Sequence, residues 1–94
     1  MKEIIFSSDF NRTKKKYIKN SSLNQEILEE VIAIFRENPQ KLEYKHIKCK
    51  KDKNRYSIRV FNTGFRILLS SLPNSFVFRC ICNHNEYDRR NRKC

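Results

Sequence analysis

Five residues in the second half of the chain have side chains that could bind an anion or transfer a proton. They are Arg59, Arg66, Arg79, His84 and Tyr87. The three arginines lie among Ile, Val, Leu and Phe, and an arginine within an apolar strand normally points away from the core. A guanidinium stays charged and can hold two phosphate oxygens, whereas an imidazole changes its charge near neutral pH. This combination predicts a surface for a polyanion, with nucleic acid as the first candidate.

The elements before these residues predict one strand and two helices. Ser8 or Asp9 can cap the first helix, and Ser22 with Gln25 has the spacing of a capping box for the second. Apolar residues recur at helical spacing in the second helix, which ends before Pro39. The expected elements are a strand over 2–7, a helix over 8–19 and a helix over 22–37.

The second half predicts a short strand near 44–47 in a lysine-rich loop and then three longer strands. These strands cover residues 56–61, 65–71 and 76–83. The tail after Tyr87 is basic, and we expect one helical turn or a disordered segment there. The order β-α-α-β-β-β predicts an α+β fold: a small, largely antiparallel sheet, covered on one face by a helical hairpin.

Length and composition narrow the possible classes of protein. The chain has 94 residues, which predicts a single domain over 1–94, and its net charge is +11. Such an excess attracts phosphate backbones, acidic proteins or anionic lipid. No apolar run approaches the roughly 20 residues that span a membrane, and no signal peptide is evident, so we expect a cytoplasmic protein with no membrane contact.

The four cysteines do not have the spacing of a zinc site. Cys80 and Cys82 lie two residues apart on an expected strand and would share a face with His84 if that strand continued. We nevertheless expect no metal, and buried free thiols on the core-facing side of the strand. Without a secretory signal, disulfides are not expected.

Three segments and the order of elements resemble the RelE/ParE superfamily of bacterial toxin–antitoxin toxins. The segments are Tyr56-Ser57-Ile58-Arg59-Val60, Gly64-Phe65-Arg66-Ile67-Leu68 and Asn83-His84-Asn85-Glu86-Tyr87. The last is most similar to the HigB-type branch, and the resemblance covers nearly the whole chain. RelE-like members cut mRNA in the ribosomal A site without a metal. ParE-like members inhibit DNA gyrase and lack the catalytic residues.

We expect a RelE-like endoribonuclease, because His84 with Arg66 and Arg59 is not needed for gyrase inhibition. The alternatives are a ParE-like gyrase inhibitor and a non-catalytic small RNA-binding protein. The resemblance implies an acidic antitoxin, the ribosome and mRNA as partners, and no small-molecule cofactor. The basic residues expected to contact RNA are Lys48, Lys50, Lys51, Lys53, Arg55, Arg79, Arg89 and Arg90.

The resemblance also implies roles for four catalytic candidates. Arg66 matches the phosphate-binding arginine, His84 an acid or base, and Tyr87 an aromatic that stacks on a base. Arg59 and Ser57 stand where RelE has lysines, so Arg59 is expected to hold phosphate rather than to move a proton. The general base stays open between Glu43 and Glu86, since the position that best matches the family's glutamate is Gln40.

Overall fold

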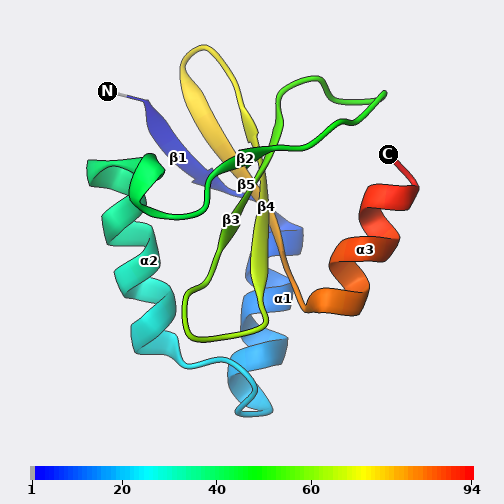
Figure 1. The fold of residues 1–94 in the computed structure, drawn as a ribbon. Helices are drawn as coiled ribbons and strands as arrows, with labels where there is room; N and C mark the ends of the chain where they lie inside the picture. The colour runs from blue at the N-terminus through cyan, green and yellow to red at the C-terminus, as the bar shows by residue number, and fades with distance from the viewer. Residues whose placement is uncertain (1) are drawn as a thin grey trace.

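A single five-stranded sheet organises residues 2–94, which are the residues described by this computed structural model (Figure 1). The strand order is β1-β5-β4-β3-β2; β1 runs parallel to β5, and the other neighbours are antiparallel. The predicted α+β fold and element order are confirmed. The elements are β1 (Glu3–Phe6), α1 (Ser8–Lys19), α2 (Gln25–Glu37), the 3₁₀ helix η1 (Pro39–Lys41), β2 (Lys45–His46), β3 (Arg55–Arg59), β4 (Arg66–Ser71), β5 (Ser75–Cys82) and α3 (His84–Arg92).

The main core lies between the sheet and the α1–α2 hairpin. Phe10 of α1, Phe35 of α2 and Phe78 of β5 are almost fully buried there. The ring of Phe78 meets the other two edge to face, with centroids 5.7 Å from Phe10 and 5.2 Å from Phe35. Burying each such side chain contributes about 1.5–3 kcal/mol, so this aromatic cluster fastens both helices to one face of the sheet.

A register shift in the β4–β5 pair allows the other face to bury side chains as well. Leu68 pairs with Cys80 and Leu69 with Phe78, so Arg79 is an extra residue on β5. Leu69 packs into the main core, whereas Leu68, Cys80 and Cys82 form a second, smaller cluster. Tyr87 of α3 packs against this cluster. The two cysteines are free and buried, as predicted, but they belong to the α3 side of the sheet.

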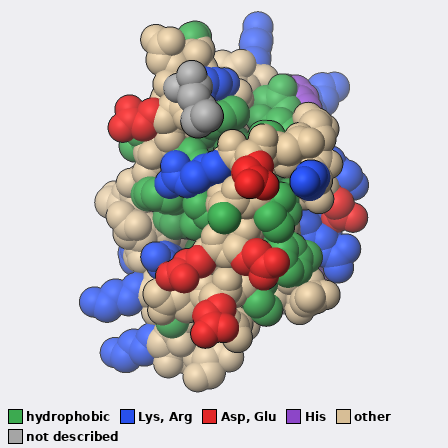
Figure 2. Space-filling model, turned by 90° about the vertical axis from the view of Figure 1, so that its left-hand side faces the viewer, with side chains coloured by type: hydrophobic (Ala, Val, Ile, Leu, Met, Phe, Trp, Pro, Cys, Tyr) green, Lys and Arg blue, Asp and Glu red, His purple; other side chains and the backbone are tan. Residues whose placement is uncertain are grey.

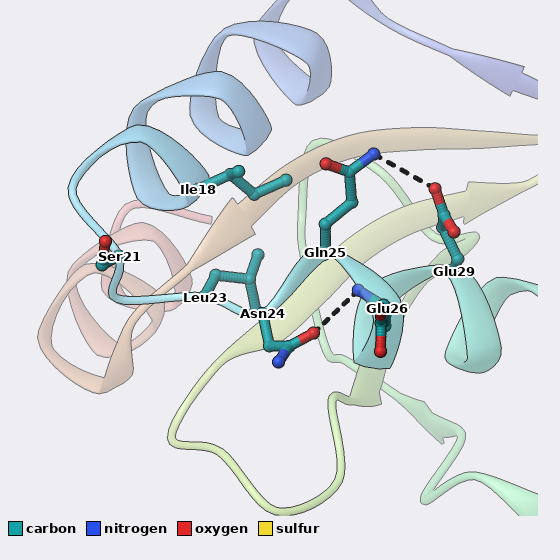
Figure 3. A pocket seen from close by; sticks show the side chains of 7 residues that line it. All are labelled: Ile18, Ser21, Leu23, Asn24, Gln25, Glu26 and Glu29. Carbon is teal, nitrogen blue, oxygen red and sulfur yellow. Dashed lines mark hydrogen bonds between the residues drawn. The ribbon is translucent and has the colours of Figure 1, made fainter.

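The helix caps differ from the prediction by one or two residues. Ser7, rather than Ser8 or Asp9, caps α1 by accepting a hydrogen bond from the backbone of Phe10 at 3.1 Å. Asn24 caps α2 by accepting a hydrogen bond from the Glu26 backbone at 2.8 Å (Figure 3). It also accepts one from the Ile27 backbone at 3.3 Å. The predicted capping box at Ser22 and Gln25 is therefore wrong, because Asn24 is a better placed acceptor. Gln25 instead donates to Glu29 at 3.1 Å.

The basic tail is a helix of nine residues, so the prediction of one turn or disorder is wrong. Asn83 caps α3 by accepting from the Glu86 backbone at 2.9 Å. One turn further on, Arg90 donates to Glu86 at 3.0 Å, and such i,i+4 pairs stabilise helices. The N-cap and the ion pair together outweigh the repulsion among the arginines of this segment.

A disulfide joins Cys49 to Cys94, 45 residues later in the sequence. The expectation that disulfides are absent is therefore wrong. That expectation rested on the lack of a secretory signal. The two cysteines meet because α3 returns the end of the chain to the loop that follows β2. In residues 2–94, no helix is both long and apolar enough to cross a membrane.

Candidate active site

Arg59 and Arg66 are directly opposite each other at the ends of β3 and β4. Their neighbours Ile58 and Ile67 are fully buried in the main core, so the two guanidinium groups are on the opposite face of the sheet. Like charges in this position repel, and Glu43 offsets them. Its Oε2 atom lies 3.6 Å from Nη1 of Arg59 and 4.0 Å from Nη1 of Arg66.

His84 approaches the same pair because β5 ends beside Arg66. Arg66 is the register partner of Cys82, and α3 begins two residues later at His84. Arg59, Arg66 and His84 line one open cleft of about 230 Å³. The remaining residues around this cleft belong to the β3–β4 hairpin: Thr63, Gly64 and Phe65. The structure therefore brings three of the four predicted catalytic residues to one cleft.

Asp88 lies next to the imidazole of His84 and was not predicted. Its Oδ2 atom is 3.4 Å from Nε2 of His84, because residues four apart share one side of a helix. The His84 side chain is 74 % exposed, so it is open to a ligand. A carboxylate at this distance can fix the orientation of the imidazole. The four-residue spacing of His84 and Asp88 would have predicted this contact if the tail had been predicted as a helix.

Tyr87, the fourth predicted residue, connects α3 to the arginine pair. Its ring centroid lies 5.3 Å from the guanidinium carbon of Arg66, within the range of a cation–π contact. Its hydroxyl lies 3.1 Å from the hydroxyl of Ser57, a residue that is only 1 % exposed. Tyr87 is therefore held on both sides, by Arg66 at its ring and by Ser57 at its hydroxyl.

Glu43 is the only one of the proposed general bases that lies beside the arginine pair. Glu86 instead bonds to Arg89 and Arg90. Burial opposes ionisation of Glu86, but the hydrogen bonds and charges of these two arginines outweigh it and lower the pKa of the carboxyl. Gln40 belongs to η1. The ring of His46 on β2 forms a hydrogen bond with the Lys53 carbonyl at 2.8 Å.

The residues predicted to bind RNA separate into two groups. Lys48, Lys50, Lys51 and Lys53 are exposed on the loop between β2 and β3. The four predicted arginines all have protein partners: Arg55 pairs with Asp52 at 3.2 Å, Arg79 donates to Ser70 at 2.6 Å, Arg89 pairs with Glu86, and Arg90 pairs with Glu86 and with Asp9 at 3.3 Å. Arg55 and Arg90 are also only partly exposed, and RNA binding by these arginines stays a prediction.

The charge is unevenly distributed over the molecule. Four of the ten acidic residues lie on α2, which carries a single arginine. Figure 2 views the molecule from the α2 side and shows acidic and apolar side chains there, with many Lys and Arg side chains at the margins. The positive excess therefore lies away from this helix. Within residues 2–94, no three His, Cys, Asp or Glu side chains are grouped closely enough to hold a metal.

Comparison with known proteins identifies similar structures but no similar sequences. No family model and no curated protein matches the chain. A complex of DinJ and YafQ from Escherichia coli contains a chain with a TM-score of 0.75 and 13 % identity, covering 90 % of this chain and 96 % of that one. A copper-bound mutant toxin from Helicobacter pylori has a TM-score of 0.72 and 18 % identity, covering 92 % and 98 %.

An archaeal structure extends this similarity. The RelB–RelE antitoxin–toxin complex from Methanococcus jannaschii gives a TM-score of 0.62 and 23 % identity, with coverage of 90 % and 96 %. Each of these structures is matched over nearly its whole length, so the similarity concerns the complete arrangement of helices and strands. The chain therefore has the fold of the RelE and YafQ toxins, as its sequence resemblance predicts.

Proposed function

We propose that this protein is the toxin of a toxin–antitoxin pair and that it cleaves mRNA on the ribosome as a metal-independent endoribonuclease. The observation that carries the proposal is the cleft at which Arg59, Arg66 and His84 meet. Cleavage beside a 2′-hydroxyl requires a base, an acid and cations that stabilise the charge on the phosphate. The cleft supplies two permanent cations and His84, and Glu43 lies within 4.0 Å of both arginines. The shared fold with the RelE and YafQ toxins supports the same conclusion.

In this proposal the scissile phosphate binds between Arg59 and Arg66 and takes the place that Glu43 occupies in the free protein. Glu43 is half exposed and within 4.0 Å of both guanidinium groups, so a phosphate there displaces its carboxylate while keeping it nearby. The displaced carboxylate then accepts the proton of the 2′-hydroxyl. The 2′-oxygen attacks phosphorus, and the arginines stabilise the charge that builds on the non-bridging oxygens.

His84 completes the reaction as the general acid. As the bond between phosphorus and the 5′-oxygen breaks, the imidazolium gives its proton to that oxygen, leaving a 2′,3′-cyclic phosphate and a 5′-hydroxyl. Asp88 orients the imidazole of His84 for this transfer. Tyr87 holds the Arg66 guanidinium in place from the side of α3.

The partners follow from charge and from the related complexes. The DinJ–YafQ and RelB–RelE structures contain an antitoxin with the toxin. A chain with a net charge of +11 attracts an acidic antitoxin as well as ribosomal RNA. We therefore propose an acidic antitoxin as the neutralising partner and the ribosome as the site of action.

Single-turnover cleavage of ribosome-bound mRNA between pH 5.5 and 8.5 tests these roles. Arg66→Ala should slow cleavage about 10²–10³-fold without changing the shape of the pH profile. His84→Ala should slow it about 10²–10⁴-fold and change the shape of the pH profile. Glu43→Gln should slow it comparably to His84→Ala. Arg36→Ala, at an exposed arginine of α2, is the matched control and should cleave at the wild-type rate.

Two results would overturn the proposal. Wild-type rates and an unchanged profile in His84→Ala would remove His84 as the acid. Pulse-labelling after induction provides the second test, because protein synthesis should fail before DNA synthesis. If DNA synthesis fails first, the protein acts as a gyrase inhibitor.

A further inference from the structure

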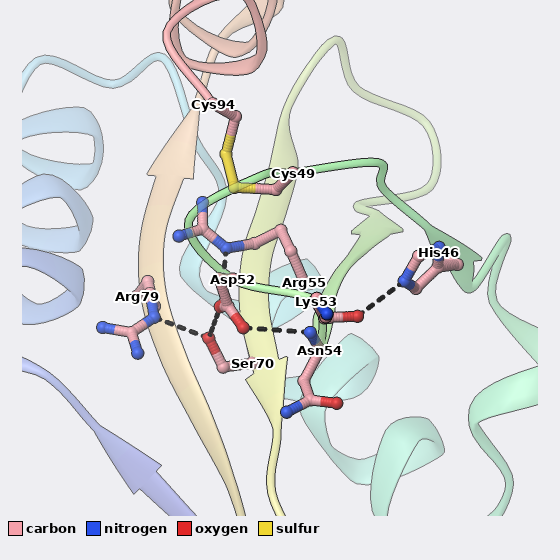
Figure 4. The surroundings of a disulfide bond; sticks show 9 residues. All are labelled: His46, Cys49, Asp52, Lys53, Asn54, Arg55, Ser70, Arg79 and Cys94. Carbon is pink, nitrogen blue, oxygen red and sulfur yellow. Dashed lines mark hydrogen bonds and ion pairs between the residues drawn. A yellow bond between two sulfur atoms is a disulfide. The ribbon is translucent and has the colours of Figure 1, made fainter.

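The Cys49–Cys94 disulfide joins two basic segments that are distant in the sequence. Cys49 lies in the loop between β2 and β3, and Cys94 follows the last residues of α3. Figure 4 shows the disulfide above the loop, with Asp52 and Arg55 beneath it. The bond is therefore a direct covalent link between the lysine-rich loop and α3.

The α3 helix has few other attachments to the fold. None of its residues is buried. Tyr87 contacts the small cluster and Ser57, and Arg90 pairs with Asp9. Both contacts come from the first two turns of the helix. Among the described residues beyond Arg90, none forms a hydrogen bond or ion pair with the rest of the fold, and the disulfide joins the end of α3 to the loop. The position of the last turn therefore depends on the disulfide.

The loop and the end of α3 carry exposed cations whose charges are not compensated. None of the ion pairs between described residues includes Lys48, Lys50, Lys51, Lys53, Arg92 or Lys93. Asp52 is the one acidic residue in the loop, and it faces Ser70 and Arg55 rather than these lysines. The disulfide thus places two sets of free cations next to each other.

We propose that the Cys49–Cys94 disulfide is a redox-sensitive link that makes one RNA-binding surface from these two segments. In the oxidised protein the loop and the end of α3 contact the phosphate backbone of structured RNA together. In the reduced protein they separate, and the contribution of the α3 cations is lost. This inference rests on the proposed function and identifies how its RNA binding would be regulated.

The chemistry of the link is thiol–disulfide exchange with a dithiol reductant. Cys49 is 6 % exposed, whereas Cys94 is only partly buried, so an incoming thiolate reaches the Cys94 sulfur first. The S–S bond breaks and Cys49 leaves as a thiolate. A second thiol of the reductant then releases Cys94. The reductant becomes a disulfide, and the protein gains two electrons and two protons.

The other two cysteines do not take part in this exchange. Cys80 and Cys82 are buried beneath α3, with their sulfur atoms 3.1 Å apart. The hydrogen bond between the two sulfurs and the burial of the site raise the pKa of Cys82 well above its ordinary value. Both side chains are almost fully buried, so neither sulfur is open to an incoming thiolate. The Cys80→Ala/Cys82→Ala protein is therefore the matched control.

Fluorescence anisotropy with a labelled RNA hairpin tests the proposal at several salt concentrations. The samples are the oxidised protein, the protein reduced with dithiothreitol, and Cys49→Ser/Cys94→Ser. Each phosphate contact contributes about 0.7–0.9 to the slope of log affinity against log salt. Loss of the two free cations at the end of α3 should therefore reduce the slope by about 1.5 and the affinity at low salt at least about 10-fold.

Two controls separate this effect from unfolding and from a general loss of charge. Circular dichroism should show a folded protein in all samples, and reoxidation should restore the slope. The Cys80→Ala/Cys82→Ala protein should respond to reductant as the wild type does. Lys15→Gln/Lys19→Gln, at two exposed lysines of α1, should bind more weakly but keep the full response to reductant.

Equal slopes and affinities in oxidised and reduced protein would refute the link. A redox response seen with poly-glutamate but not with RNA would also refute it, because the surface would then serve an acidic protein. The experiment distinguishes failure of this inference from failure of the proposed function. If RNA binding responds to reductant but no mRNA is cleaved, the RNA-binding surface is supported and the endoribonuclease activity is refuted. If mRNA is cleaved with no redox effect on binding, only the present inference is wrong.

Discussion

Asp52 anchors the lysine-rich loop to the sheet, and its charge should make a measurable contribution to stability. Its carboxylate accepts hydrogen bonds from Ser70 at 2.5 Å, the Asn54 backbone at 3.0 Å and Arg55 at 3.2 Å (Figure 4). Arg79 in turn donates to Ser70 at 2.6 Å. The side chains of Asp52 and Arg55 are each 17 % exposed, so water screens this network only weakly.

Replacing Asp52 with Asn keeps the shape of the side chain and removes its charge. Hydrogen bonds to a charged group contribute about 1.5–3 kcal/mol, against about 0.5–1.5 kcal/mol for neutral pairs. With Arg55 also left without a counter-charge, we expect Asp52→Asn to lower the free energy of unfolding by about 2–3 kcal/mol at pH 7. The entropy of unfolding of about 2.1 cal/mol/K per residue, over 94 residues, converts this to about 10–15 °C in Tm.

The difference should disappear in acid. Burial alone would raise the pKa of Asp52, but the hydrogen bonds from Ser70, Asn54 and Arg55, together with the Arg55 charge, outweigh it and lower the pKa. A carboxyl with a lowered pKa in the folded protein stabilises the fold above its unfolded pKa of about 3.9. This stabilisation is lost as the pH falls below 4, through the folded-state value.

Thermal unfolding of wild type and Asp52→Asn at pH 7, 5, 4 and 3 measures this effect. The two Tm values should be well separated at pH 7 and 5 and should converge toward pH 3. Glu30→Gln, at an exposed glutamate of α2, is the control and should change the free energy of unfolding by less than about 0.5 kcal/mol. A constant Tm difference across the whole pH range would refute the role of the Asp52 charge.

Three further substitutions test other parts of the structure. Thr13→Val should lower the free energy of unfolding in urea by about 1–3 kcal/mol, because the buried N–H of Ile81 loses its acceptor, the Thr13 hydroxyl at 3.0 Å. Thr13→Ser keeps that hydroxyl and should retain most of the wild-type stability. In the same assay, Asn24→Ala should lower the free energy of unfolding by about 0.5–2 kcal/mol, and Ser22→Ala should leave it almost unchanged. A larger loss in Ser22→Ala would instead support the capping box predicted from the sequence. Tyr87→Phe should keep most of the cleavage rate, whereas Tyr87→Ala should reduce kcat at least about 10-fold by releasing Arg66; equal rates in the two would argue against positioning through the ring.

The elements of the sheet and hairpin were predictable because their side chains alternate or recur with a clear period. Arg59 next to Ile58 and Arg66 next to Ile67 indicate which face of each strand is buried. The same alternation placed both arginines on one face, and so most of the candidate site could be read from the sequence. The pairing of Arg59 with Arg66, by contrast, depends on strand register, which a single sequence leaves open.

The sequence did not predict the structural features that depend on a single hydrogen bond or on one extra residue in a strand. Several polar residues precede α2, and only the backbone path shows that Asn24 is the cap. The bulge that leaves Arg79 without a partner residue on β4 has no sequence signal, yet it places Cys80 on the α3 side, beside Leu68. The α3 helix has no apolar period, because Tyr87 is its only large apolar contact with the sheet. The Cys49–Cys94 pairing could not be predicted without that helix.

The parallel pairing of β1 with β5 has a consequence for how the chain folds. Residue 3 pairs with residue 75 and residue 6 with residue 78, so the first strand has no partner in the sheet until β5 exists. Contacts between such distant residues form late and slow the search for the native state. During synthesis, α1 and α2 leave the ribosome before the strands that cover their apolar faces. The core therefore closes only after β5 emerges, and the cleft forms after that, since His84 follows β5 in the chain.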